Sequence, residues 1–154
     1  MISGRNRRRP VGVALGLFVA SFLWLAPGAA EAQILGLWST KEGKSHVRIE
    51  PCGDNLCGTI VWLKEPLDDE TGAPKVDKYN KDEGQRTKPL IGLKMLTDFP
   101  LDGDGDDKWS GGRIYNPENG KTYRSKLKLL ETGQLKVSGC VLFFCDGQTW
   151  DRVE

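Results

Sequence analysis

Short runs of alternating apolar and polar residues recur through most of the sequence, and turn-forming residues separate them about every ten positions. Alternation with period two places one set of side chains on each face of a β-strand. No run carries a sustained helical period. The pattern therefore predicts an all-β chain, with strands at residues 36–39, 46–51, 58–63, 92–99, 109–116, 122–130, 134–139 and 147–153.

These strands and their mostly short connections predict one small antiparallel β-barrel of about eight strands, within a domain covering residues 36–152. Closing the sheet removes the exposed edges that an open sheet would have. A two-sheet β-sandwich is the alternative. One connection is long: residues 64–90 are polar, contain proline and carry charges of both signs. A connection of this length either has a function or is a solvated loop.

The first 32 residues have the order of a secretory signal peptide. Four arginines precede an apolar run over residues 11–26, and small residues ending in Ala30-Glu31-Ala32 follow. The apolar run is shorter than the roughly 20 residues that a membrane-spanning helix needs. We therefore expect cleavage after Ala32, a periplasmic or secreted protein, and no stable membrane span after processing.

The expected mature chain is nearly balanced in charge. Removing four arginines and Glu31 from the 22 basic and 21 acidic side chains leaves 18 basic and 20 acidic ones, a net charge of −2. This balance gives no reason to expect nucleic acid or an anionic membrane as a partner.

All four cysteines lie in the mature chain, as two pairs with the same spacing. An even number of cysteines in a small exported chain indicates disulfides more than a metal site. In the first pair, a four-residue hairpin loop would make Cys52 and Cys57 direct cross-strand neighbours.

The same hairpin register predicts a candidate ligand-binding surface. It would oppose Ile49 to Ile60 and Val47 to Trp62, which places all four side chains on one buried face. A small apolar molecule between the strands would contact this face. The candidate ligand-binding residues are Val47, Ile49, Ile60 and Trp62.

The second pair, Cys140 and Cys145, allows two interpretations. A local disulfide would hold the apolar residues 141–144 out as a loop. If instead residues 146–147 formed a two-residue turn, one extended strand would keep the two cysteines about 16 Å apart. Each would then bond to Cys52 or Cys57. The repeated spacing favours local pairs.

No metal, cofactor or catalytic residue is expected. Residues 101–112 place aspartates where an EF-hand loop needs them, but Asp107 occupies the position of its glycine and Arg113 that of its glutamate. A plain acidic turn is the simpler interpretation. His46 is the one histidine of the chain, and no nucleophile is identifiable beside it. The chain is therefore more simply understood as a protein without enzymatic activity.

The residues expected to close one end of the barrel resemble those of lipocalin-like barrels. Trp38 lies in a Gly-x-Trp motif on the first strand, and Trp150 and Arg152 share a face of the last strand. In such barrels a late arginine packs across the first-strand tryptophan, a cation–π contact.

A second resemblance covers residues 36–152. The motifs that carry it are GLWST, CGDNLCGTIVWL, KPLIGLKML, WSGGRIYNPENGKTYRSKLKL and LKVSGC…CDGQTWDR, in this order. Through them the chain resembles the secreted bacterial proteins of the domain-of-unknown-function family numbered 2147. The resemblance implies export and a compact β-domain, and it supplies no catalytic residue. The chain departs from the family in enclosing VLFF, where glycines are common, between its last two cysteines.

Three functional hypotheses follow. The first is an exported barrel that binds a small apolar or amphipathic ligand. The second is a module that docks another cell-envelope protein through residues 141–144 or 64–90. The third is a hydrolase with a carboxylate site on its loops. Ligand binding fits best, because export without an identifiable catalytic set suits carriage better than turnover. The size of the barrel does not decide, since eight strands are either filled by their side chains or leave room for one small ligand.

The position of the signal peptide predicts the mass of the exported protein. Because the small-residue motif ends at Ala32, the mature chain should begin at Gln33. Intact-mass spectrometry of the protein isolated from the cell envelope or medium measures this. A major species that retains residues 1–32 would contradict it.

Overall fold

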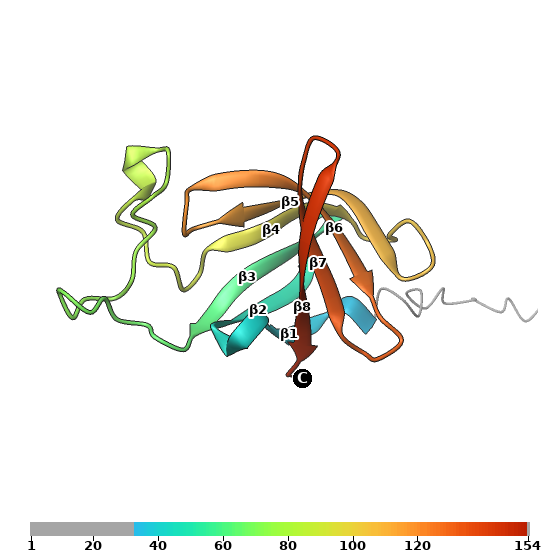
Figure 1. Cartoon of the computed structure of the whole chain (residues 1–154), viewed down its shortest axis with the longest axis horizontal. Coiled ribbons are helices and arrows are strands. Elements are labelled where there is room, and N and C mark those ends of the chain that lie inside the picture. Colours follow the sequence, from blue (N-terminus) through green and yellow to red (C-terminus); the bar gives the residue numbers. More distant parts are fainter. Residues whose placement is uncertain (1–32, 154) are drawn as a thin grey trace, which may run out of the picture.

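The computed structural model describes residues 33–153, so the expected signal peptide lies outside the described residues. Eight strands follow one another around a closed barrel in chain order (Figure 1). Each strand pairs antiparallel with the next, and the first pairs with the last. The predicted barrel is thus confirmed, and the sandwich alternative is wrong. The strands are β1 (Gly36–Ser39), β2 (Ser45–Cys52), β3 (Asn55–Leu63), β4 (Lys94–Pro100), β5 (Lys108–Asn116), β6 (Lys121–Leu129), β7 (Leu135–Val141) and β8 (Phe144–Arg152).

The antiparallel order gives the barrel two different ends. We call the end with the β2–β3 and β6–β7 turns the closed end, and the end with the β5–β6 and β7–β8 turns the open end. Large side chains fill the interior toward the closed end, where Trp38, Trp109 and Trp150 are at most 1% exposed. Alternation along the strands places these side chains inside, as the sequence pattern predicts.

The closed end is covered by the last residue of β8. The guanidinium of Arg152 lies 4.3 Å from the ring centroid of Trp38, and its nitrogens donate to the carbonyls of Leu35 and Gln33. The indole of Trp38 donates to the Ile34 carbonyl at 2.8 Å. The short segment before β1 is therefore tied to both strands that close the barrel.

Two glycines allow neighbouring strands to approach closely inside the barrel. A Cβ on Gly58 would collide with the Leu96 side chain, and one on Gly112 would overlap the Phe99 ring. Phe99 and Leu96 are almost fully buried. The absence of side chains on β3 and β5 thus makes room for large residues of β4.

The first disulfide is confirmed, but the hairpin around it differs from the predicted one. Cys52 bonds Cys57, with 5.8 Å between their Cα atoms. The turn contains two residues, Gly53 and Asp54, since Cys52 pairs in register with Asn55. Gly53 has a φ of 69°, a conformation that suits glycine in a tight turn. The disulfide therefore joins diagonal neighbours instead of directly opposed residues.

The shorter turn shifts the register by two residues, which keeps the faces of the strands, and a bulge further along β3 moves Trp62 out of the barrel. Val47 faces Ile60, and His46 faces Trp62, so β3 has one extra residue, Val61, at this point. Such a bulge turns the following side chain to the other face. Trp62 is 43% exposed and lies against His46, with ring centroids 4.4 Å apart. The prediction that Trp62 shares the buried face is therefore wrong.

The second disulfide is also local, as the repeated spacing indicated. Cys140 pairs directly with Cys145 across β7 and β8, and their Cα atoms are 4.0 Å apart. The turn is formed by Leu142 and Phe143, so the alternative turn at residues 146–147 is wrong. Figure 1 shows the tip of this hairpin projecting away from the other strands.

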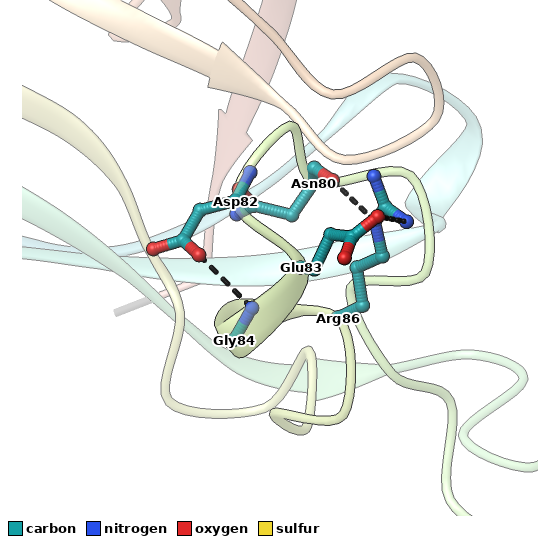
Figure 2. A network of polar contacts seen from close by, with 5 residues as sticks. All are labelled: Asn80, Asp82, Glu83, Gly84 and Arg86. Carbon is teal, nitrogen blue, oxygen red and sulfur yellow. Dashed lines mark hydrogen bonds and ion pairs between the residues drawn. The ribbon is translucent and has the colours of Figure 1, made fainter.

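The long connection has an ordered backbone. Isolated bridges pair Leu67 with Pro74 and Val76 with Pro89. A 3₁₀ turn, η2 (Glu83–Gln85), is capped by Asp82, whose carboxylate accepts from the Gly84 amide at 2.9 Å (Figure 2). Arg86 donates to the Asn80 carbonyl at 2.7 Å and pairs with Glu83. The long connection therefore has bridges, a capped turn and hydrogen bonds of its own.

The close approach at Gly112 generates a stability prediction. Gly112→Ala should lower the free energy of unfolding by about 1–3 kcal/mol, because the new Cβ overlaps the Phe99 ring. Urea unfolding without reductant measures it. Gly139→Ala is the matched control: it is also in a strand, but its Cβ would meet Ile114 at an ordinary 3.5 Å. Equal stability of the two variants would contradict the prediction.

Candidate ligand site at the open end of the barrel

A hollow of about 550 Å³ lies at the open end. Its floor is apolar and consists of Met95, Ile114 and Val137, which are at most 9% exposed. Most of its remaining lining carries hydroxyl, amide or charged side chains: Thr40, Lys41, Glu42, Lys44, Ser45, Tyr115, Asn116, Glu118, Tyr123, Asp146 and Gln148. Gly139, Val141 and Gly147 complete it. The volume lies within the range of small-molecule sites, roughly 300–1,000 Å³.

The hollow exists because the strands carry small or polar residues where they approach this end. Along β7, the inward positions change from Leu135 and Val137 to Gly139. A Cβ on Gly139 would lie 3.5 Å from Ile114 and 3.6 Å from Tyr123, so its absence leaves space between them. On β8, the alternation that buries Trp150 places Gln148 at the hollow.

The rim is polar, and part of it is held in place by hydrogen bonds. The hydroxyls of Thr40 and Ser45 lie 3.0 Å apart, and the Ser45 amide donates to the Thr40 hydroxyl. The hydroxyl of Tyr123 accepts from the Asn119 amide at 3.0 Å. An apolar floor below a polar rim suits a molecule with one apolar and one polar end.

A buried carboxylate anchors the long connection beside this rim. Asp77 is 1% exposed and accepts from the Tyr115 hydroxyl at 2.7 Å and from the Asn80 amide at 2.6 Å. Burial of the phenol, together with its hydrogen bond to the carboxylate, raises the pKa of Tyr115 to about 12. Gly120, in the β5–β6 turn, has no side chain that would clash with the backbone of Tyr79.

The residues predicted from sequence are distributed differently from this site. Val47, Ile49 and Ile60 are at most 3% exposed and pack in the core, and they are not among the residues that line the hollow. Trp62 lies outside the barrel. Trp38, Trp150 and Arg152 are at the opposite, closed end. The sequence signal for the real hollow was Gly139 and Gln148, a small and a polar residue at inward positions.

Other candidate features lie elsewhere. The acidic turn at residues 102–107 follows β4 at the closed end. Within residues 33–153, no three His, Cys, Asp or Glu side chains form a group that could hold a metal ion. The same part of the chain contains no helix long and apolar enough to cross a membrane. The two disulfides fit a periplasmic or extracellular protein.

Comparison with known proteins decides the family. A family model described as "Uncharacterized protein conserved in bacteria (DUF2147)" matches residues 36–152. The chain belongs to this family. No curated protein matches it.

Among solved structures, the chain is similar to HP1028 from Helicobacter pylori, described as belonging to the lipocalin family. The two are 21% identical, with a TM-score of 0.67 over 78% of this chain and 82% of that one. At this identity the likeness shows a shared fold, the lipocalin-like barrel.

The anchor of the long connection generates a prediction. Tyr115→Phe removes a hydrogen bond to a buried carboxylate, so it should lower stability by about 1.5–3 kcal/mol and speed amide exchange of Asp77 and Leu90, whose amides bond within the segment. Tyr123→Phe, which loses only an exposed hydroxyl, should have a much smaller effect.

The pH dependence of this effect follows from the raised pKa of Tyr115. Since the pKa is higher in the folded chain than the ordinary value of 10.0, the stabilisation is complete below about pH 10 and is lost as the pH rises through 12. The stability difference between wild type and Tyr115→Phe, measured by urea unfolding, should therefore shrink over this interval. A difference that is constant with pH would contradict the anchor.

Proposed function

We propose that the mature protein is exported, after cleavage behind Ala32, and binds a small amphipathic molecule in the hollow at the open end. The observation that carries the proposal is the hollow itself, in which an apolar floor of Met95, Ile114 and Val137 lies below a polar rim. The apolar part of the ligand would lie on the floor. Its polar end would lie among the hydroxyl, amide and charged groups of the rim.

Three further features support this proposal. The lipocalin-like fold is compatible with small-ligand binding, since an eight-stranded barrel whose side chains do not fill it can hold one small molecule. The two disulfides fit an exported carrier. The rim offers both signs of charge, such as Lys44 and Glu42, 3.8 Å apart, so it favours no single ionic head group.

The proposed site in the hollow differs from the ligand-binding face expected from the sequence. Val47, Ile49 and Ile60 support the floor from within the core and would not contact the ligand directly. Trp62 would have no part in binding. Docking of another envelope protein stays the alternative, because residues 141–144 are exposed and apolar.

Ligand titration with a filled-hollow variant tests the proposal. A dansyl-labelled medium-chain fatty acid should bind saturably to the mature protein, with increased emission. Gly139→Leu should weaken this binding at least about tenfold, because the added side chain occupies the hollow. Trp62→Ala should leave it unchanged, since that side chain lies outside. No saturable binding, or loss of binding in Trp62→Ala alone, would contradict the proposed site.

A further inference from the structure

The register of β5, β6 and β7 gathers positive charge on one outer face of the barrel. Along these strands the outward positions carry exposed basic residues, with like charges opposed in register: Lys108 faces Lys128, Arg113 faces Arg124, and Lys128 also faces Lys136. Like charges directly opposite one another destabilise a sheet. We call these residues the basic face: Lys108, Arg113, Arg124, Lys126, Lys128 and Lys136.

Few of these cations form an ion pair. Lys108 pairs with Asp106 and Arg113 with Asp98. Among the described residues, the other four cations of the basic face form no ion pair. Lys126, Lys128 and Lys136 border one shallow depression, to which Asp104 contributes the single carboxylate. At the closed-end margin of the face, Asp106, Asp107 and Glu131 line a second depression together with Lys108 and Lys128.

The tip of the β7–β8 hairpin is apolar and lies at the open-end limit of this face, next to Arg124, whereas Lys108, Lys128 and Lys136 lie toward the closed end. Leu142, Phe143 and Phe144 are 73%, 96% and 83% exposed, and Val141 is 57% exposed. The disulfide directly behind the tip holds the hairpin closed. Arg124 joins the two features: it faces Cys140 in register, and its guanidinium donates to the Leu142 carbonyl at 3.2 Å.

We propose that the hairpin tip and the basic face dock the protein onto an anionic phospholipid bilayer. The tip would insert its two phenylalanines among the lipid head groups and acyl chains, and the cations along the face would be attracted to the negative surface. Apolar residues beside a cationic surface are the pattern of interfacial membrane binding. The tip projects from the barrel, so it can enter a bilayer without any change in the strands (Figure 1).

A lipid surface fits these features better than another macromolecule does. Nucleic acid or an acidic polysaccharide would use the lysines, but it would leave the aliphatic tip residues in water. A protein partner that received the protruding tip in a groove would leave the lysines along the face unused. The proposal does not depend on ligand binding in the hollow, since the lining of the hollow includes neither the lysines of the face nor the phenylalanines of the tip.

Vesicle flotation of the purified mature protein tests the proposal. The protein should float with vesicles of phosphatidylcholine and phosphatidylglycerol, remain behind with phosphatidylcholine alone, and dissociate as sodium chloride is raised. Each lysine near an anionic bilayer contributes about fivefold to affinity. Lys126→Gln/Lys128→Gln/Lys136→Gln should therefore weaken binding at least about 20-fold, and Phe143→Ser/Phe144→Ser at least about tenfold.

Matched variants control for total charge and total apolar surface. Lys64→Gln/Lys81→Gln/Lys88→Gln removes three exposed lysines from the long connection, and Leu67→Ser/Ile91→Ser removes two exposed apolar side chains. Both should bind as wild type does. Circular dichroism and thermal unfolding confirm that each variant is folded, which is expected because every altered side chain is exposed.

A direct measurement reports insertion of the tip. In Phe143→Trp, emission should shift to shorter wavelength on addition of the anionic vesicles and be quenched by brominated acyl chains. Three outcomes would overturn the proposal: no flotation of the wild type, binding that the phenylalanine variant retains in full, or binding of single-stranded DNA as tight as that of the vesicles. Flotation that the lysine control loses equally would overturn it as well.

Discussion

The pairing of the first strand with the last is the contact on which the barrel depends. Among the described residues, two register pairs join β1 to β8, Trp38 with Arg152 and Ser39 with Asp151, and the Val153 amide just beyond β8 donates to the Leu37 carbonyl at 2.8 Å. Bringing the two ends of the domain together costs chain entropy, and so short a ladder offers few hydrogen bonds in return. Arg152 adds to it by lying over Trp38 and donating to carbonyls ahead of β1. Without this closure the sheet would have two exposed edges.

The two ends of the barrel differ because the sizes of the inward side chains differ. Tryptophans from three strands fill the interior toward the closed end, and glycines on neighbouring strands make room for Phe99 and Leu96. At the open end, Gly139 and Gln148 leave a hollow above the packed core. The packed half can therefore support the walls of the hollow, so that a ligand would enter a site that is already formed.

Two further features lie at the open end, and neither is part of the packed core. The ordered connection is anchored there through Asp77 and Tyr115, and the stapled β7–β8 hairpin projects there with its apolar tip. The basic face runs along the strands that lead to this tip. Docking of the tip on a bilayer would hold the mouth of the hollow near lipid, the source of many amphipathic molecules. The two proposals are thus compatible, although each is tested separately.

The sequence by itself determined the all-β class, the eight strands and the first disulfide, and it favoured the barrel over a sandwich and a local second disulfide over a crossed pairing. It could do so because period-two alternation, turn residues and cysteine spacing act over a few neighbouring positions. The strand bounds from the sequence agree with the structure to within three residues, the largest differences being at the starts of β3 and β8. The partner of Trp38 was also accessible, because parity along the last strand and a known lipocalin-like pattern both indicated Arg152.

Only the tertiary structure decided the register, the hollow and the surface charge. A single extra residue at Val61 turned Trp62 outward, and a local sequence pattern does not contain such a bulge. The hollow depends on Met95, Ile114 and Val137, which come from three strands and meet only when the sheet closes. The charges sum to nearly zero along the chain, yet strand pairing places the cations of β5, β6 and β7 side by side. Composition counts charges, whereas register decides which of them become neighbours.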